Sequence, residues 1–150
     1  MYRFALGVEY DGAGYCGWQK QVSINLETVQ GKLEEALSRV ANYSIRTACA
    51  GRTDSGVHAT NQVVHFDTPV DRGNKAWTVG VNSLLPPSIR VTWVKAVDQS
   101  FHARFSATAR RYKYLIYCQR VESVFLRKKA VWMKEELDLK LMNDAAGVLL

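Results

Sequence analysis

The sequence predicts an α+β fold in which helices cover one face of an antiparallel sheet, with the split β-α-β-β-α-β order called ferredoxin-like. Two observations predict it. Alternating apolar and polar residues, the pattern of a half-buried strand, recur along residues 2–97. Segments with helical periodicity separate the first strand from the second and the third from the fourth. We therefore expect a first domain over residues 1–100 and a second segment over 101–150.

The first strand and the first helix carry the clearest patterns. Residues 2–10 have aromatic or β-forming side chains at every second position, which predicts a strand. Residues 28–40 predict a helix with Thr28 as its N-cap. One apolar stripe runs along this helix, formed by Val29, Leu33, Ala36, Leu37 and Val40.

Two more strands are expected on either side of a short loop. Residues 45–50 and 62–67 are rich in apolar and β-branched residues. Between them, residues 51–56 contain Gly, Asp and Ser, which favour turns. This loop therefore joins two neighbouring strands of the sheet.

A second helix, a fourth strand and an extra strand are expected next. Residues 74–85 predict the helix, with Asn74 as a cap, and a Pro-Pro pair ends it. Residues 89–97 predict the fourth strand, which completes the first domain. After a Phe-rich connector, residues 110–118 predict an additional strand of alternating character.

A last helix is expected to begin at Asp138, with an apolar stripe formed by Leu141, Ala145, Val148 and Leu149. The chain stops at Leu150 inside this apolar run, without a Gly or Pro stop or a polar tail. This ending favours a fragment whose second half is missing. The alternative is a short helix that is packed by its last residues.

The composition is that of an ordinary globular protein, with 47% hydrophobic and 23% charged residues among 150. No uncharged apolar run approaches the ~20 residues of a membrane helix. Charges at Arg3 and Glu9 interrupt the N-terminus, which predicts no secretory signal. The three cysteines form neither a disulfide framework nor a zinc pattern. We expect a cytoplasmic location.

The net charge of +6 has an uneven distribution. Basic residues gather in the second segment, at Arg104, Arg110, Arg111, Lys113, Arg120 and residues 127–129. They form either a solvated face or a surface that binds phosphates. Tyr112 lies between two of these cations and could stack on an extruded base. The alternative is that this strand's aromatic residues pack on the core.

The loop at residues 51–59 combines turn formers with reactive side chains. Gly51 and Gly56 permit a tight loop with unusual backbone angles. Arg52 and Asp54 are two positions apart, so extended backbone places both side chains on one face. A carboxylate beside a guanidinium is held ionised and can act as a nucleophile or general base. Asp-Ser-Gly is also a common turn, and Arg-Asp pairs often only pin loops.

This loop resembles the nucleophile loop of the tRNA pseudouridine synthase A family. Further stretches resemble the same family in the same order: Glu9-Tyr10-Asp11-Gly12, Gly17-Trp18-Gln19, Val29-Gln30, Leu33-Glu34, residues 62–66, residues 101–107 and residues 111–114. The resemblance covers nearly the whole chain. It departs at Ser55, where Ala is expected.

The resemblance implies a pseudouridine synthase fold and the isomerisation of uridine in the anticodon stem-loop of tRNA. It implies that Asp54 is the nucleophile, that Arg52 pairs with it and helps to occupy the space of the flipped nucleotide, and that Tyr112 stacks on the target base. Substrate-binding residues would be Arg104, Arg110, Arg111, Lys113 and His58. No metal or organic cofactor is expected, and the partners would be tRNA and a second copy of the chain.

Two other functions stay open at this point. One is a non-catalytic RNA-binding module with ferredoxin-like topology, although the Lys/Arg-Gly-Phe/Tyr motif of RNA-recognition motifs is absent from the sequence. The other is a small αβ domain whose loops are purely structural. By the family resemblance, residues 1–150 are the first half of a longer, pseudo-symmetric protein, and we expect little or no activity from this half alone.

Overall fold

A computed structural model describes residues 1–21 and 26–149 of the chain. The chain forms two compact units, residues 1–110 and residues 111–150. The connector that follows the last strand of the main sheet, up to Arg110, therefore belongs to the first unit. Each unit is described by itself.

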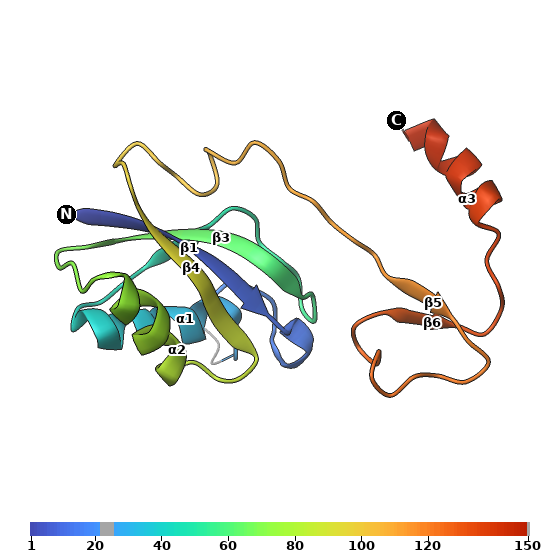
Figure 1. Ribbon diagram of the computed structural model, residues 1–150, viewed down its shortest axis with the longest axis horizontal. Helices are drawn as coiled ribbons and strands as arrows, with labels where there is room; N and C mark the ends of the chain where they lie inside the picture. Colours follow the sequence, from blue (N-terminus) through green and yellow to red (C-terminus); the bar gives the residue numbers. More distant parts are fainter. Residues whose placement is uncertain (22–25, 150) are drawn as a thin grey trace. The chain divides into compact units, whose positions relative to one another are not determined.

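The first unit contains a four-stranded antiparallel sheet with the strand order β2-β3-β1-β4. Its strands are β1 (Tyr2–Tyr10), β2 (Thr47–Cys49), β3 (Ala59–Thr68) and β4 (Ile89–Val97). Helix α1 (Val29–Ala41) follows β1, and a short helical run, η2 (Ala76–Gly80) continued by α2 (Val81–Leu84), precedes β4. Both helical segments lie against the same face of the sheet (Figure 1). The predicted β-α-β-β-α-β order is confirmed.

Helix α1 follows its predicted pattern closely. Thr28 has extended backbone angles, and its hydroxyl accepts the backbone N–H of Gly31, so it is the N-cap that the sequence predicts. Asn42 ends the helix in a left-handed conformation with φ of 52°, which Asn tolerates better than most residues. The predicted apolar stripe is buried at Val29, Leu33, Ala36 and Leu37.

The core between helices and sheet is centred on three aromatic rings. Phe4 on β1, Phe66 on β3 and Trp77 in η2 have ring centroids 5.1 to 5.7 Å apart. All three are nearly fully buried. Rings at these separations add attraction beyond the burial of apolar area. Phe4 and Phe66 are cross-strand partners, so their side chains lie on the same face of the sheet, the face toward the helices.

The second helix differs from its prediction in two ways. Asn74 is not a cap, because the helical turn already includes it. The acceptor at this turn is the Asp71 carboxylate, which bonds the backbone N–H of Gly73. The middle of the segment, Ala76–Gly80, is a π-helix. The sequence carries no periodic signal for such a widened turn.

Several strand boundaries also differ from the prediction. The strand predicted over 45–50 is limited to β2, because only Thr47–Cys49 pair with β3. β3 is longer than predicted and pairs along nearly all of β1. The strand predicted over 110–118 is reduced to β5 (Ile116–Cys118), which pairs in parallel with the unpredicted β6 (Val131–Met133).

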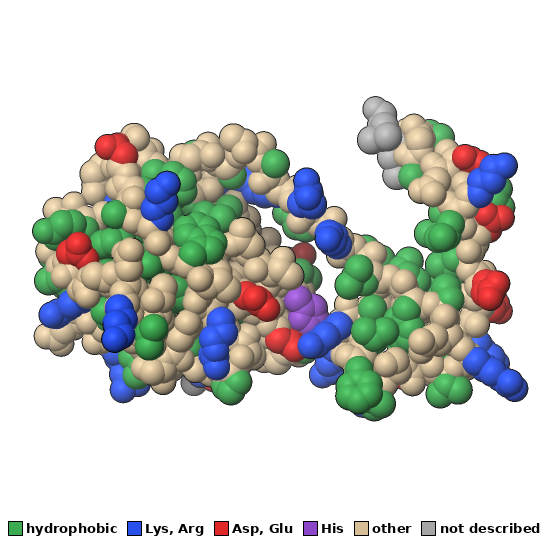
Figure 2. Space-filling model, viewed as in Figure 1, with side chains coloured by type: hydrophobic (Ala, Val, Ile, Leu, Met, Phe, Trp, Pro, Cys, Tyr) green, Lys and Arg blue, Asp and Glu red, His purple; other side chains and the backbone are tan. Residues whose placement is uncertain are grey.

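The second unit has little interior. Helix α3 (Leu139–Ala146) begins after Asp138, whose carboxylate accepts two backbone N–H groups, so this predicted cap is confirmed. A 3-10 turn, η3 (Gly147–Leu149), follows it. Among the described residues α3 buries none, and side chains such as Phe125 and Val148 are almost fully exposed. Hydrophobic side chains are visible on the molecular surface (Figure 2). Leu150 and the side chain of Leu149, which belong to the predicted apolar run, lie outside the described residues.

Side chains from the helical layer cap the backbone at both edges of the sheet. On β4, the Asn82 amide accepts the N–H of Val91 and donates to its carbonyl, each at 2.8 Å. On β2, Glu34 accepts the N–H of Thr47 and Gln30 donates to its carbonyl. These polar groups would otherwise lack a strand partner, so the caps supply the hydrogen bonds that an edge leaves open.

The connector after β4 packs on the face of the sheet opposite the helices. The Nδ1 atom of His65 accepts the backbone N–H of Ala103 at 3.2 Å, and the His65 and His102 rings lie 4.5 Å apart. Arg3 forms a bidentate pair with Asp67 and also donates to the carbonyl of Phe101. Residues 98–106 are thus fastened to β1 and β3.

In the described part of the chain, no helix is both long and apolar enough to span a membrane.

We expect Thr28→Ala to lower the free energy of unfolding by about 1 kcal/mol, because the N–H of Gly31 loses its acceptor. Thr28→Ser keeps a hydroxyl at this position and should remain within a few tenths of a kcal/mol of the wild type. Urea denaturation of the three proteins checks this. Equal stability of the Ala and wild-type proteins would show that the cap contributes nothing.

We expect the stability of the first unit to fall with acidification through His65. Burial, the neighbouring His102 and Arg3 lower the pKa of His65 below its ordinary value. The unfolded chain therefore binds a proton at higher pH than the folded one, so stability is complete above the unfolded pKa of about 6.5 and declines below it. Denaturation between pH 7.5 and 5.5 should show a shallower decline in His65→Gln, and an unchanged slope would contradict this origin.

Candidate functional site

The predicted nucleophile loop lies between β2 and β3. The residue before it is tied to the sheet, because the N–H of Ala50 donates to the carbonyl of Val63 at 2.8 Å. The side chains of Arg52 and Asp54 are exposed, whereas Gly51 and Thr53 are only partly exposed. The loop therefore turns its charged side chains to solvent and its alternate residues to the protein.

Gly51 is held by a side chain of β3. Gln62 is largely buried, and its amide accepts the N–H of Gly51 and donates to the Gly51 carbonyl. This two-way contact reproduces the pairing of a strand partner. It fixes the backbone on the N-terminal side of Arg52.

Thr53 is held from two sides. Its hydroxyl lies 2.8 Å from the Tyr10 hydroxyl, and its carbonyl accepts the N–H of Trp18 at 3.0 Å. The Tyr10 and Trp18 rings pack on each other with centroids 5.8 Å apart. Gly17 has a φ of 82°, and a Cβ atom there would lie 2.8 Å from the Thr53 carbonyl oxygen, so glycine allows this close approach.

The loop closes in a turn after Asp54. The Asp54 carbonyl accepts the N–H of Val57, and the Tyr15 carbonyl accepts both the Ser55 hydroxyl and the N–H of Gly56. Gly56 has a φ of 78°, which confirms the unusual backbone angle predicted there. Gly51 has no such angle. Ser55, the departure from the family pattern, thus gains a hydrogen bond.

The ion pair expected between Arg52 and Asp54 is absent from the ion pairs of the described residues. The physical reason is exposure, because both side chains lie in solvent, where closing an ion pair gains little free energy. Both groups consequently remain accessible to an incoming substrate.

His58 fastens the end of the loop to the segment after β1. Its Nδ1 atom lies 3.0 Å from a carboxylate oxygen of Asp11 and 3.3 Å from the N–H nitrogen of Gly12. The imidazole is about one-third exposed. The sequence suggested His58 as a substrate-binding residue, and these contacts give it a holding role within the chain.

Arg110 joins the start of the loop to the connector. Its Nε atom donates to the carbonyl of Ala50 at 2.8 Å, and a terminal nitrogen donates to the carbonyl of Arg104 at 2.9 Å. Arg104 itself is exposed, with its guanidinium carbon 5.8 Å from the centre of the Phe105 ring. Two N–H donors of Arg110 are therefore hydrogen-bonded within the first unit.

The remaining predicted residues, Arg111, Tyr112 and Lys113, belong to the second unit. All three are exposed, and Tyr112 has a relative accessibility of 73%. This finding rules out the alternative in which Tyr112 packs on the core of that unit. An exposed aromatic ring between two cations is suited to a nucleobase.

The structure adds residues to which the sequence assigned no role at the site. Tyr10, Trp18 and Gln62 hold the loop, and the only signal for them was that they lie in stretches that resemble the family. Burial raises the pKa of the Tyr10 phenol above its ordinary value, so its hydroxyl remains protonated at neutral pH.

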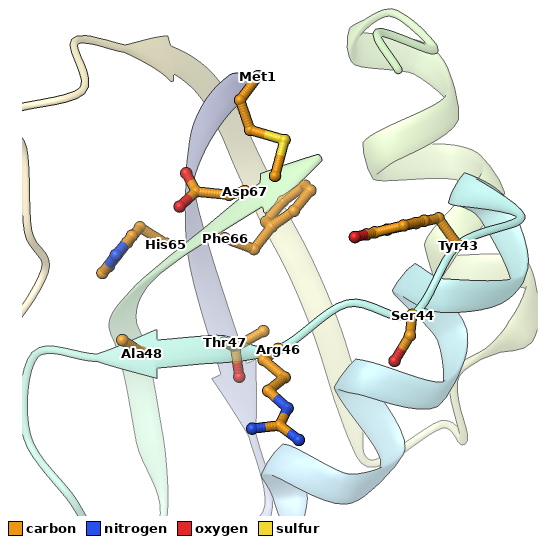
Figure 3. Close-up of a pocket in the computed structure, with 9 residues that line it drawn as sticks. All are labelled: Met1, Tyr43, Ser44, Arg46, Thr47, Ala48, His65, Phe66 and Asp67. Carbon is orange, nitrogen blue, oxygen red and sulfur yellow. The ribbon is translucent and has the colours of Figure 1, made fainter. Parts of the chain in front are cut away.

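A separate hollow of about 480 Å³ opens at the edge of the sheet near the N-terminus (Figure 3). Its lining includes Tyr43, Arg46 and Asp67, and no residue of the loop contributes to it. Asp67 is already paired with Arg3. Within the described ranges, no group of three or more His, Cys, Asp or Glu side chains could hold a metal ion.

Comparisons with known proteins identify the family of the chain. The family profile described as tRNA pseudouridine synthase matches residues 7–106. The chain is 57% identical to tRNA pseudouridine synthase A of Shewanella denitrificans over 148 residues, which are 99% of this chain and 56% of the relative. The same protein of Pseudoalteromonas atlantica is 56% identical, over 98% of this chain and 55% of the relative. That of Escherichia coli O1:K1 is 55% identical, over 100% of this chain and 55% of the relative.

The chain thus spans about half the length of the curated relatives it matches. The profile match includes the whole loop with Arg52 and Asp54 and the segments that hold it. This chain belongs to the tRNA pseudouridine synthase family.

Proposed function

We propose that this chain is the nucleophile-bearing, N-terminal part of an enzyme that isomerises uridine to pseudouridine in the anticodon stem-loop of tRNA. The observation that carries the proposal is the presentation of Asp54. Its carboxylate is exposed on a loop whose flanking residues are hydrogen-bonded to other segments. A fixed, accessible carboxylate is what an attack on a bound nucleotide needs.

The reaction explains why the site must be open. The bond between N1 of the base and C1′ of the ribose breaks, the base turns, and C5 bonds to C1′. The proton on C5 is lost and N1 gains one, so the reaction needs no oxidant or reductant. A stacked base cannot turn, and it must first leave the helix at a cost of a few kcal/mol.

Asp54 would then act on the extruded nucleotide. Its carboxylate can add to the base, add to the sugar, or assist a glycal-like intermediate by removing a proton. Arg52, which is also exposed, would occupy part of the space that the flipped nucleotide leaves. Tyr112 would stack on the target base, and its exposed ring is consistent with this role.

The two units would have different roles in the reaction. The first unit carries the nucleophile, and the second supplies Arg111 and Lys113 to the phosphates, with Arg104 from the connector. Arg110 would contribute less to RNA than the sequence suggested, because Ala50 and Arg104 already accept two of its N–H groups. His58 would support the loop and reach the substrate only from its exposed edge.

The complete enzyme would be longer than this chain. The curated relatives are nearly twice its length, so a further segment would close the cleft around the nucleotide and exclude water. We further propose a homodimer in the cytoplasm that needs neither a metal nor an organic cofactor. Residues 1–150 alone would have little or no activity.

The test uses a hybrid in which residues 1–150 are joined to the remaining part of the Shewanella denitrificans relative. We expect the hybrid to form pseudouridine in unmodified tRNA, and Asp54→Asn to lower turnover at least about a thousandfold because the nucleophile is lost. Binding of tRNA should remain within a few-fold, because the phosphate contacts are unchanged. Pseudouridine is measured by mass spectrometry, and binding by filter retention at fixed salt.

Asp71→Asn is the matched control, because it removes the same charge from an exposed carboxylate that lies at the turn before η2. It should retain full turnover. Equal turnover of Asp54→Asn and the unchanged hybrid would reject Asp54 as the nucleophile. A hybrid that folds and binds tRNA without forming pseudouridine would favour a non-catalytic RNA-binding protein.

A further inference from the structure

We infer that Tyr10 and Thr53 are positioning residues, which hold the Asp54 carboxylate in its reactive place through a single hydrogen bond between their hydroxyl groups. The inference rests on the proposed function. It assigns a role in the reaction to two residues that do not touch the reacting atoms.

Thr53 occupies a fixed place in the loop. It directly precedes Asp54, and its carbonyl is bonded to the N–H of Trp18 while its hydroxyl is bonded to Tyr10. Because the peptide group is planar, fixing this carbonyl fixes the plane between Thr53 and Asp54. That plane contains the N–Cα bond of Asp54, so it fixes the place of the carbon atom that carries the side chain.

Tyr10 is held rigidly in the sheet. It is the last residue of β1 and pairs with Ala59 on β3 and with Ile89 on β4, so both neighbouring strands hold its backbone. Its side chain is 3% exposed, and its ring packs against Trp18. The phenol is therefore an anchor at the end of an inner strand of the sheet, and its hydroxyl reaches the loop.

The contact between Tyr10 and Thr53 is a hydrogen bond between two partly buried hydroxyl groups. Burial raises the pKa of the Tyr10 phenol, so the hydroxyl keeps its proton at neutral pH. A hydrogen bond in such an environment is stronger than in water. Small displacements of a reacting group by about 1 Å can cost about a hundredfold in rate, so this anchor bears on turnover.

The chain offers a matched contact for comparison. The Tyr15 and Ser88 hydroxyls lie 2.7 Å apart, and this partly buried pair joins the segment after β1 to the residue before β4. Neither hydroxyl bonds the loop that carries Asp54 among the described contacts. Ser88→Ala therefore removes a similar hydrogen bond without releasing Thr53.

The kinetic experiment uses the hybrid described above. Tyr10→Phe and Thr53→Val should each lower kcat about tenfold and leave KM within about twofold, because the substrate contacts are unchanged. Thr53→Ser should restore most of kcat. The double variant should be no slower than either single variant, since both substitutions remove the same hydrogen bond between Tyr10 and Thr53. Ser88→Ala should turn over like the unchanged hybrid. Unchanged kcat in Tyr10→Phe, or an equal loss in Ser88→Ala, would overturn the inference.

A second measurement does not require activity. In residues 1–150, amide hydrogen exchange at Gly56 and Val57 should become about tenfold faster in Tyr10→Phe and in Thr53→Val, while exchange along β1 stays the same. Unchanged exchange at both amides overturns the inference even if the hybrid is active. Faster exchange together with an unchanged hybrid that folds but makes no pseudouridine rejects the proposed function, and the assigned role in catalysis falls with it.

Discussion

The candidate site depends on a backbone that is fixed at every second residue. Gly51, Thr53 and Ser55 each bond to a different part of the first unit, whereas Arg52 and Asp54 between them face solvent. An exposed loop would ordinarily place its side chains over a wide range of directions. Here residues that bond to the protein alternate with residues whose charged side chains are exposed. This arrangement holds the backbone that carries the two charges without burying either of them. The charged groups thus avoid the desolvation cost that a buried pair would carry.

The support for this loop comes from segments that are distant in sequence, which explains its dependence on the whole sheet. Tyr10 belongs to β1, Trp18 to the segment after it, and Gln62 to β3. The antiparallel pairing of β1 with β3 brings the first and the last of these to the same end of the sheet. The connector adds a further contact through Arg110. The residues that hold the loop therefore come together only when the strands pair in this order.

The parts of this arrangement that the sequence predicted are those with local patterns. The alternation of β1 and the stripe of α1 gave both elements to within one residue, and the turn-forming residues after Ala50 placed the loop between β2 and β3. The short β2, the π-helical turn around Trp77 and the unpredicted β6 depend on pairing and packing with distant residues, which no local pattern records. The ion pair expected between Arg52 and Asp54 is not among those of the described residues, since residue spacing alone does not set a contact between two exposed side chains.

The capped edges of the main sheet have a consequence for the behaviour of the protein at high concentration. An uncovered strand edge is a template on which another chain can add a strand, and this is a common start of aggregation. At Val91 and Thr47 the groups that would accept such a strand are already occupied by Asn82, Gln30 and Glu34. A foreign strand would have to displace these side chains before it could pair there. The helices that cover the core thereby also protect the sheet against disordered self-association.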